Sequence, residues 1–351
     1  MRWPWKGKSS QDQLIVSWSA GTFAYVRAQA TGSDGQFRVA QLGVERQGDD
    51  SKDNFVRRLQ ALGLKGVVAR VMLRPEQYQL LQIDAPPVAP EELRAAARFQ
   101  IREMVNVHID DITLDVMQVG DGQQKGPNNL FVVAAKNEVV REVIALGDAM
   151  NWKVSVIDIQ ETAQRNLQSA MAKLDGRLER ADAALMISDE TQALLTISAN
   201  EELFFTRRLD LPQGFLSMPW GATHDATADA APDAFTPVSE YVPDYAGVST
   251  TGAASSDLGE AERIQRFLVE VQRSLDLWDR TWSSMPLGGL RVYAGERSDE
   301  LATWLSREMG QNVSAMDPAG QFDGLQTMAV ADQTYCLPLL GVLLRTETRK
   351  L

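Results

Sequence analysis

Residues 14–44 read LIVSWSAGTFAYVRAQATGSDGQFRVAQLGV, and the fold assignment starts from this stretch. Its segments 14–19 and 22–30 are rich in β-branched and aromatic residues, which fit the pleated surface of a strand. The turn residues Gly-Ser-Asp-Gly at 32–35 separate them from a third segment of the same kind at 36–44. The stretch therefore predicts a meander of three antiparallel strands.

The meander pattern returns about 170 residues later. Segments 184–188 (ALMIS), 192–198 (QALLTIS) and 203–209 (LFFTRRL) again have strand composition and are separated by short turns. Each copy is followed by a helical pattern and a buried-strand pattern, at 52–72 and at 264–294. A duplicated βββαβ unit predicts an α/β protein with two related lobes that face each other across a cleft.

An additional αβ segment interrupts the first lobe. Its helix, at 90–105, is predicted to start at Pro90, because proline suits the first helical position and acidic residues suit the first turn. We expect five parts along the chain: an N-terminal tail at 1–12, lobe 1 at 13–76 and 121–175, the inserted module at 77–120, and lobe 2 at 176–345.

Residues 218–258 consist mostly of Ala, Thr, Ser, Pro, Gly and acidic residues. So few large apolar side chains cannot offset the entropy lost on ordering, and we predict a disordered acidic insertion within lobe 2. The formal net charge is −12, and nine carboxylates between residues 209 and 262, a stretch without Lys or Arg, account for most of it. The rest of the chain is close to neutral and lacks the basic surplus of a nucleic-acid-binding protein.

The sequence also predicts the compartment. No apolar run approaches the ~20 residues of a membrane-spanning helix, and the N-terminus MRWPWKGKSS has cations but no apolar segment behind them, as a secretory signal would have. Cys336 is the only cysteine, which excludes an internal disulfide and fits a reducing environment. We therefore expect a cytoplasmic protein.

Three longer stretches carry a family resemblance: 78–116 (YQLLQIDAPPVAPEELRAAARFQIREMVNVHIDDITLDV), 267–282 (FLVEVQRSLDLWDRTW), and 290–318 (LRVYAGERSDELATWLSREMGQNVSAMDP) with 337–345 (LPLLGVLLR). In order and spacing they resemble the PilM family of type IV pilus assembly proteins, and within it the MshI proteins of MSHA-type pilus systems. The resemblance covers essentially the whole chain apart from the acidic insertion.

This resemblance implies an actin-like, ribonuclease H-like fold of two lobes, with an inserted module of the FtsA/PilM 1C type. It also implies a scaffold at the cytoplasmic face of the bacterial inner membrane. Such a scaffold binds the N-terminal tail of a PilN-like, here MshJ-like, membrane protein.

Actin-like ATPases hold phosphates on two hairpin turns that carry Asp and Gly, and they seat adenine on a third, glycine-containing turn. The resemblance places these turns at 17–19, 186–188 and 294–296. Ser17 and Ser19 stand where Asp and Gly are expected, the second turn carries Met186 and Ser188, and the third keeps one glycine in Ala294-Gly295. We therefore expect a degenerate site with no cofactor and no ATP hydrolysis. Nucleotide binding without hydrolysis is the alternative left open.

In the PilM family the PilN-like tail lies in a groove between lobe 1 and the inserted module. The resemblance points to the strand at 78–83 and the helix at 90–105, where an extended tail would pair its backbone or bury apolar side chains. The candidate contacts are Tyr78, Leu80, Leu81, Phe99 and Met104. The alternative for Leu80, Leu81, Phe99 and Met104 is that these side chains belong to the core.

Two further contacts are expected outside this groove. The N-terminal residues combine positive charge with tryptophans, as in segments that touch anionic lipid headgroups, although an untethered polar terminus explains them as well. The acidic insertion is a candidate contact for other pilus platform proteins or for the motor ATPase. The lipid-facing candidates are Arg2, Trp3, Trp5, Lys6 and Lys8.

His108 lies near Asp110 and Asp111, which are metal-ligand types, but a solvated loop accounts for them and we expect no metal. Two other functions stay open at this point. One is an active actin-like ATPase. The other is a GspL-like cytoplasmic component of a type II secretion system, which would continue into a membrane-spanning helix.

Overall fold

A computed structural model describes residues 12–31, 35–120, 128–220 and 254–346, and of residues 254–261 it describes the backbone only. The cationic N-terminus with Arg2, Trp3, Trp5, Lys6 and Lys8 lies outside the described residues, as does most of the acidic insertion. No helix in the described part of the chain is both long enough and apolar enough to cross a membrane.

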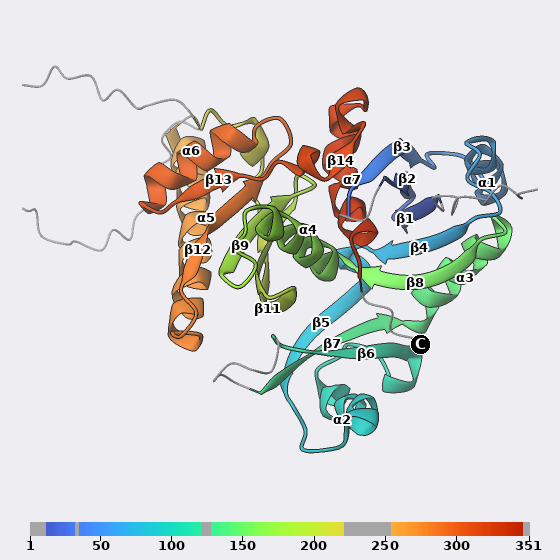
Figure 1. Cartoon of the computed structure of the whole chain (residues 1–351), viewed down its shortest axis with the longest axis horizontal. Helices are drawn as coiled ribbons and strands as arrows, with labels where there is room; N and C mark the ends of the chain where they lie inside the picture. The colour runs from blue at the N-terminus through green and yellow to red at the C-terminus, as the bar shows by residue number, and fades with distance from the viewer. Residues whose placement is uncertain (1–11, 32–34, 121–127, 221–253, 347–351) are drawn as a thin grey trace, which may run out of the picture.

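Lobe 1 is built on a six-stranded mixed sheet in the order β14-β3-β2-β1-β4-β8 (Figure 1). The predicted meander forms its antiparallel half, and β4 and β8 run parallel to β1. Its strands are β1 (Gln13–Ser19), β2 (Thr22–Ala30), β3 (Phe37–Arg46), β4 (Val68–Leu73), β8 (Lys153–Ile159) and β14 (Phe322–Asp323).

Alternation along β1 divides the lobe into two layers, because successive side chains of a strand point to opposite faces. Leu14 and Val16 pack with α1 (Lys52–Ala61) and α3 (Asn137–Ala149). Ile15 packs on the opposite face, with α7 (Val330–Leu343). Both faces of the sheet are therefore covered by helices.

Lobe 2 repeats this plan. Its five-stranded sheet has the order β11-β10-β9-β12-β13, which matches β3-β2-β1-β4-β8 of lobe 1 strand for strand. Two helices, α5 (Ala254–Thr281) and α6 (Ser298–Met309), pack on one face, and α4 (Gln160–Leu174) packs on the other. The strands are β9 (Ala181–Ile187), β10 (Gln192–Ala199), β11 (Glu202–Asp210), β12 (Leu287–Tyr293) and β13 (Val313–Ala315). The predicted duplication is confirmed.

The inserted module is a three-stranded antiparallel sheet in the order β5-β7-β6, covered on one side by α2 (Leu93–Gln100). Its strands are β5 (Tyr78–Asp84), β6 (Ile112–Gln118) and β7 (Asn129–Lys136). Because β7 pairs with both other strands, the module reaches residue 136, and the predicted end at residue 120 is wrong. From here on, the inserted module means residues 78–136.

The predicted helix at 90–105 is also shorter than expected. Pro90–Glu92 and Ile101–Glu103 form 3₁₀ turns on either side of α2. After Glu103 the sequence continues Met-Val-Asn-Val. The β-branched residues and Asn in that run have weak helix propensity, which accounts for the early end.

The inserted module is joined to lobe 2 as well as to lobe 1. Val119 and Phe131 belong to the same buried cluster as the core of lobe 2, and the backbone N–H of Gly120 donates to the carbonyl of Leu203 at 2.8 Å. Gly120 has φ of +71°, and a Cβ there would lie 2.3 Å from the ring of Phe204. Glycine is therefore required where the module meets β11.

The two central helices, α4 and α7, pack directly against each other. Their closest approach is at Gly341, where an added Cβ would lie 2.1 Å from the carbonyl oxygen of Ala163. The Asn166 side chain donates to the Gly341 carbonyl at 3.0 Å. The missing side chain at Gly341 therefore sets the distance between the helices.

The acidic insertion is shorter than the predicted 218–258. Trp220 is buried and stacks on Trp304, and the Arg297 guanidinium lies 4.0 Å from the centroid of the Trp220 ring. Arg297 also donates to the carbonyls of Leu216 and Met218. At the other end, α5 already begins at Ala254. Aromatic and arginine contacts thus order residues that the polar composition assigned to the insertion.

Cys336 is fully buried in α7, and burial raises the pKa of its thiol to about 12. Because only the thiolate reacts, we expect the native protein to resist alkylation by iodoacetamide at about pH 8 and to react once it is unfolded. Mass spectrometry of the adduct, with and without denaturant, measures this. Alkylation of the native protein at the rate of an exposed thiol would contradict the buried position.

Candidate functional site

The first predicted phosphate turn lies inside a strand. Ser17 and Ser19 are residues of β1, and Ser19 pairs with Thr22 of β2, which leaves a two-residue turn of Ala20 and Gly21. Both turn residues have positive φ, +48° and +71°, as a type I′ hairpin turn requires. The residues predicted at 17–19 thus end strand β1 directly before the turn, and their relation to a phosphate stays a prediction.

The second predicted turn likewise begins in a strand. Met186 is fully buried in β9, and the chain turns after Ser188. This turn contains Asp189, a carboxylate that the sequence assignment missed. Its Oδ1 accepts hydrogen bonds from the Thr191 N–H at 2.7 Å, the Thr191 hydroxyl at 2.6 Å and the Gln192 N–H at 3.1 Å. The carboxylate is thus committed to holding its own turn.

The third predicted turn follows β12, as expected, but its polar groups are satisfied internally. The Ser298 hydroxyl accepts from the Ala294 N–H at 2.9 Å and donates to the Gly295 carbonyl at 2.7 Å. Gly295 has φ of +62°, and a Cβ there would lie 2.6 Å from the Thr334 hydroxyl of α7. The turn is therefore packed closely against α7.

A buried arginine lies beside the first hairpin. The Arg74 Nε donates to the Ser17 hydroxyl at 3.1 Å, and its Nη2 donates to the Tyr335 carbonyl at 3.1 Å. The guanidinium also lies 4.0 Å from the centroid of the Tyr335 ring. Burial raises the pKa of Tyr335, and the charges of Arg74, Glu76 and Asp189 also act on it. Ser17 of the first predicted turn and Asp189 beside the second thus both lie near Tyr335, and the positive charge of Arg74 lies next to Ser17 and Tyr335.

A second arginine joins lobe 2 to the inserted module. Arg208 of β11 pairs with Glu161 of α4, with Nη2 2.8 Å from Oε1, and donates to the Pro75 carbonyl at 2.9 Å. The Tyr78 hydroxyl donates to the other oxygen of Glu161, and the Arg208 guanidinium lies 4.8 Å from the centroid of the Tyr78 ring. Burial and the adjacent Glu161 raise the pKa of Tyr78 well above its usual value.

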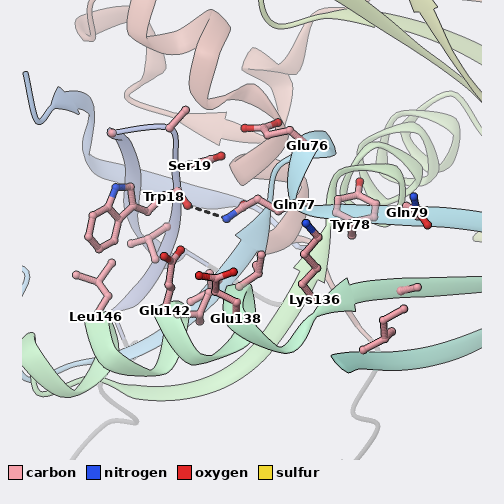
Figure 2. A pocket seen from close by; sticks show the side chains of 18 of the residues that line it. Trp18, Ser19, Glu76, Gln77, Tyr78, Gln79, Lys136, Glu138, Glu142 and Leu146 are labelled. Carbon is pink, nitrogen blue, oxygen red and sulfur yellow. Dashed lines mark hydrogen bonds between the residues drawn. The ribbon is translucent and has the colours of Figure 1, made fainter. Parts of the chain in front are cut away.

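A groove of about 790 Å³ lies between lobe 1 and the inserted module (Figure 2). Its size is that of a site for a small ligand or a few peptide residues. The residues lining it come from the β1–β2 hairpin, the start of β5, the end of β7 and α3. Its lining side chains include Trp18, Gln77, Lys136, Glu138, Glu142 and Leu146.

Hydrogen bonds join this groove to the buried Arg74. The Gln77 side chain donates from Nε2 to the Trp18 carbonyl at 3.0 Å (Figure 2). Its Oε1 accepts from the Arg74 N–H at 2.8 Å. The Trp18 ring packs on Phe55 with centroids 6.0 Å apart, and the Lys52 Nζ lies 5.4 Å from the ring centroid. The aromatic wall of the groove is therefore held from both sides.

Of the five side chains predicted to contact a partner, only Tyr78 lines this groove. Leu80 is partly buried against the cores of both lobes, and Leu81 against that of the inserted module, on the opposite face of β5. Phe99 and Met104 are 78% and 46% exposed but lie elsewhere on the inserted module. Their contact with a partner stays a prediction.

The groove residues of α3 could have been identified from helical spacing. Glu138 and Glu142 are four residues apart, and Val139, Val143 and Leu146 follow the same periodicity, so both sets fall on one side of the helix. The sequence does not show that this side faces the β1–β2 hairpin, because that contact depends on the tertiary fold.

The histidine considered as a metal ligand lies on the surface. His108 Nδ1 is 3.6 Å from Asp110 Oδ2, and both side chains are at least 70% exposed. Within the residues that the structure describes, no group of three or more His, Cys, Asp or Glu side chains is placed to hold a metal ion.

Comparison with known proteins was made by sequence and by structure. No family model and no curated protein matches the sequence. Among solved structures, one described as a PilM-PilN type IV pilus biogenesis complex is similar with a TM-score of 0.63 and 14% identity, over 96% of this chain and 99% of that one.

Two more distant structures were also found. The cytoplasmic domain of EpsL, an inner-membrane component of the type II secretion system of Vibrio cholerae, matches with a TM-score of 0.41 and 14% identity over 61% of this chain and 79% of that one. A Bacteroides thetaiotaomicron protein of actin-like ATPase fold matches with a TM-score of 0.45 and 10% identity over 94% of this chain and 96% of that one. The chain has an actin-like fold similar to that of PilM.

Proposed function

We propose that the chain is a non-catalytic scaffold that binds an extended segment of a membrane protein in the groove between lobe 1 and the inserted module. The groove carries this proposal, because it combines a supported aromatic wall with polar side chains on a rigid strand and helix. The partner is a PilN-like protein, named as such in the similar solved complex. In the finer assignment it is MshJ-like, and the chain acts as an MshI-type component of an MSHA-type pilus.

The absence of catalysis is proposed from the side chains around the nucleotide positions. Ser17 offers a hydroxyl where Mg²⁺ needs a carboxylate, and the adjacent Arg74 places a positive charge that repels a cation. Asp189 is bonded within its own turn. We therefore propose that the chain neither binds nor hydrolyses Mg·ATP and that protein contacts are its activity.

An active ATPase is the second candidate, and two residues favour it. Gly21 and Asp189 lie in the two hairpin turns and are the residue types, Gly and Asp, that actin-like ATPases carry in their phosphate turns. Activity would require Asp189 to leave its hydrogen bonds and Arg74 to bind a phosphate oxygen in place of Ser17.

Calorimetric titration tests both candidates. We expect the cytoplasmic N-terminal peptide of a PilN-like protein to bind with one-to-one stoichiometry, and Mg·ATP to give no heat and no phosphate release. Binding and turnover of Mg·ATP would reverse the assignment. Absence of peptide binding would remove the scaffold proposal.

Matched variants separate the two candidate surfaces. Trp18→Ala removes part of the groove wall and should weaken peptide binding at least tenfold, the size of effect common for an aromatic anchor. Phe99→Ser changes the exposed surface of α2 and should leave binding unchanged. If Phe99→Ser weakens peptide binding and Trp18→Ala does not, the partner binds on the surface that includes Phe99 and Met104.

The location of the scaffold follows from its partner. We propose that the chain lies at the cytoplasmic face of the inner membrane, held there by the PilN-like protein. The cationic N-terminus is proposed to contact lipid, and the acidic insertion to contact platform proteins or the motor ATPase. Most of these residues lie outside the described part of the chain.

A further inference from the structure

Two carboxylates of one helix face point into the groove. Glu138 and Glu142 of α3 both line it, and their side chains project toward Gln77 and Trp18 of the opposite wall (Figure 2). Among the described residues, neither carboxylate has an ion-pair partner or a side-chain hydrogen bond.

This arrangement is unfavourable for the folded protein alone. Like charges four residues apart on a helix repel each other. At Glu138 the repulsion is offset, because this residue lies in the first turn of α3, where the helix dipole favours an anion. Glu142 lies beyond that turn. Stability of the helix therefore does not account for Glu142, whereas a positively charged occupant of the groove does.

The cations of the groove are placed apart from this pair. Lys52 is held over the Trp18 ring, on the side of the hairpin. Lys136 lies at the end of β7, next to Tyr78 and Gln79 (Figure 2). A third carboxylate, Glu76, also lines the groove (Figure 2). Neither lysine is paired with Glu138 or Glu142, so the centre of the groove is negative.

An apolar surface adjoins the two carboxylates. Val139, Val143 and Leu146 of α3 line the groove together with Val16 and Val71 of the lobe 1 sheet. An extended segment places alternate side chains on opposite sides, about 7 Å apart along one side. Such a segment could carry one apolar and one basic side chain on the same side. The apolar side chain would then contact the valines and Leu146, and the basic side chain would contact the two carboxylates.

We propose that the groove selects a segment that carries a basic side chain, or a free amino terminus, seated between Glu138 and Glu142, with an apolar side chain beside it on the surface formed by Val143 and Leu146. This inference rests on the proposed function and specifies the charge of the partner. The occupant is a segment of another protein.

Two double variants test it with the N-terminal peptide of the PilN-like protein as the probe. Glu138→Lys with Glu142→Lys should weaken binding at least tenfold at low salt, and the difference should shrink as salt is raised. Glu138→Gln with Glu142→Gln should weaken binding less, while its melting temperature equals or exceeds that of the unaltered chain because the repulsion is gone. Asp148→Lys, exposed on the same helix but outside the groove, is the control for net charge.

The outcomes distinguish this inference from the proposed function. If the peptide binds the unaltered chain and both double variants equally well, the charge inference is wrong and the scaffold proposal stands. If the peptide binds none of them, the scaffold proposal fails and the inference fails with it. If the peptide binds only a chain shortened by residues 1–11, the cationic N-terminus is the occupant, which also overturns the inference.

Discussion

Replacing Arg208 by methionine is expected to lower the free energy of unfolding by about 3–5 kcal/mol, the cost of leaving a buried charge unpaired. The side chain of Glu161 is 1% exposed, and Arg208 is its ion-pair partner at 2.8 Å. Methionine keeps most of the volume of arginine but leaves Glu161 with the Tyr78 hydroxyl alone. Chemical denaturation monitored by tryptophan fluorescence gives the difference.

The neighbouring residue provides the control. Arg207 also forms an ion pair, with Glu270, but these two side chains are 39% and 27% exposed. Arg207→Met should therefore cost at most about 1 kcal/mol, as exposed pairs do. Equal losses in the two variants would show that Arg208 contributes through packing rather than through charge.

Replacing Gly341 by alanine is expected to destabilise the protein by about 3 kcal/mol, at the upper end of the range for overpacked cores. The new Cβ would lie 2.1 Å from the Ala163 carbonyl oxygen, which is backbone and cannot rotate away. The two central helices would have to separate, and the contacts of both lobes with them would be disturbed. Thermal unfolding followed by circular dichroism measures the loss.

Gly147 of α3 is the matched control. It is also helical, but its added Cβ would meet a methyl group of Val154 at 2.9 Å, and a side chain can move. Alanine favours the helix by about 1 kcal/mol over glycine, so Gly147→Ala should be close to neutral. If Gly341→Ala lowers the stability only slightly while Gly147→Ala lowers it strongly, the proposed basis of the helix packing is wrong.

The duplicated architecture could be predicted from the sequence because each strand has its own composition. Residues 14–30 and 184–198 identify both meanders by local propensity, and their order along the chain is enough to suggest two related lobes. The end of the inserted module could not be predicted in the same way. Strands β6 and β7 are separated in sequence by residues 119–128, and the pairing of β7 with β5 depends on contacts distant in sequence.

The candidate site was harder to predict for the same reason. The resemblance placed the phosphate turns at 17–19 and 186–188, and the residues that reverse the chain follow directly after these positions. Arg74 lies 57 residues from Ser17 and 261 from Tyr335, so neither contact leaves a local pattern. The groove likewise combines a hairpin, a strand and a helix, none of which indicates the other two.

The inserted module completes the interior of the second lobe. A module attached only through its two ends could be deleted or exchanged between related chains with little damage. Here, Phe131 and Val119 fill space beside Phe204, so a chain without residues 78–136 would expose part of that interior to water. Evolutionary loss of the insertion would therefore require compensating changes on β11, and the three parts are expected to melt in a single cooperative step.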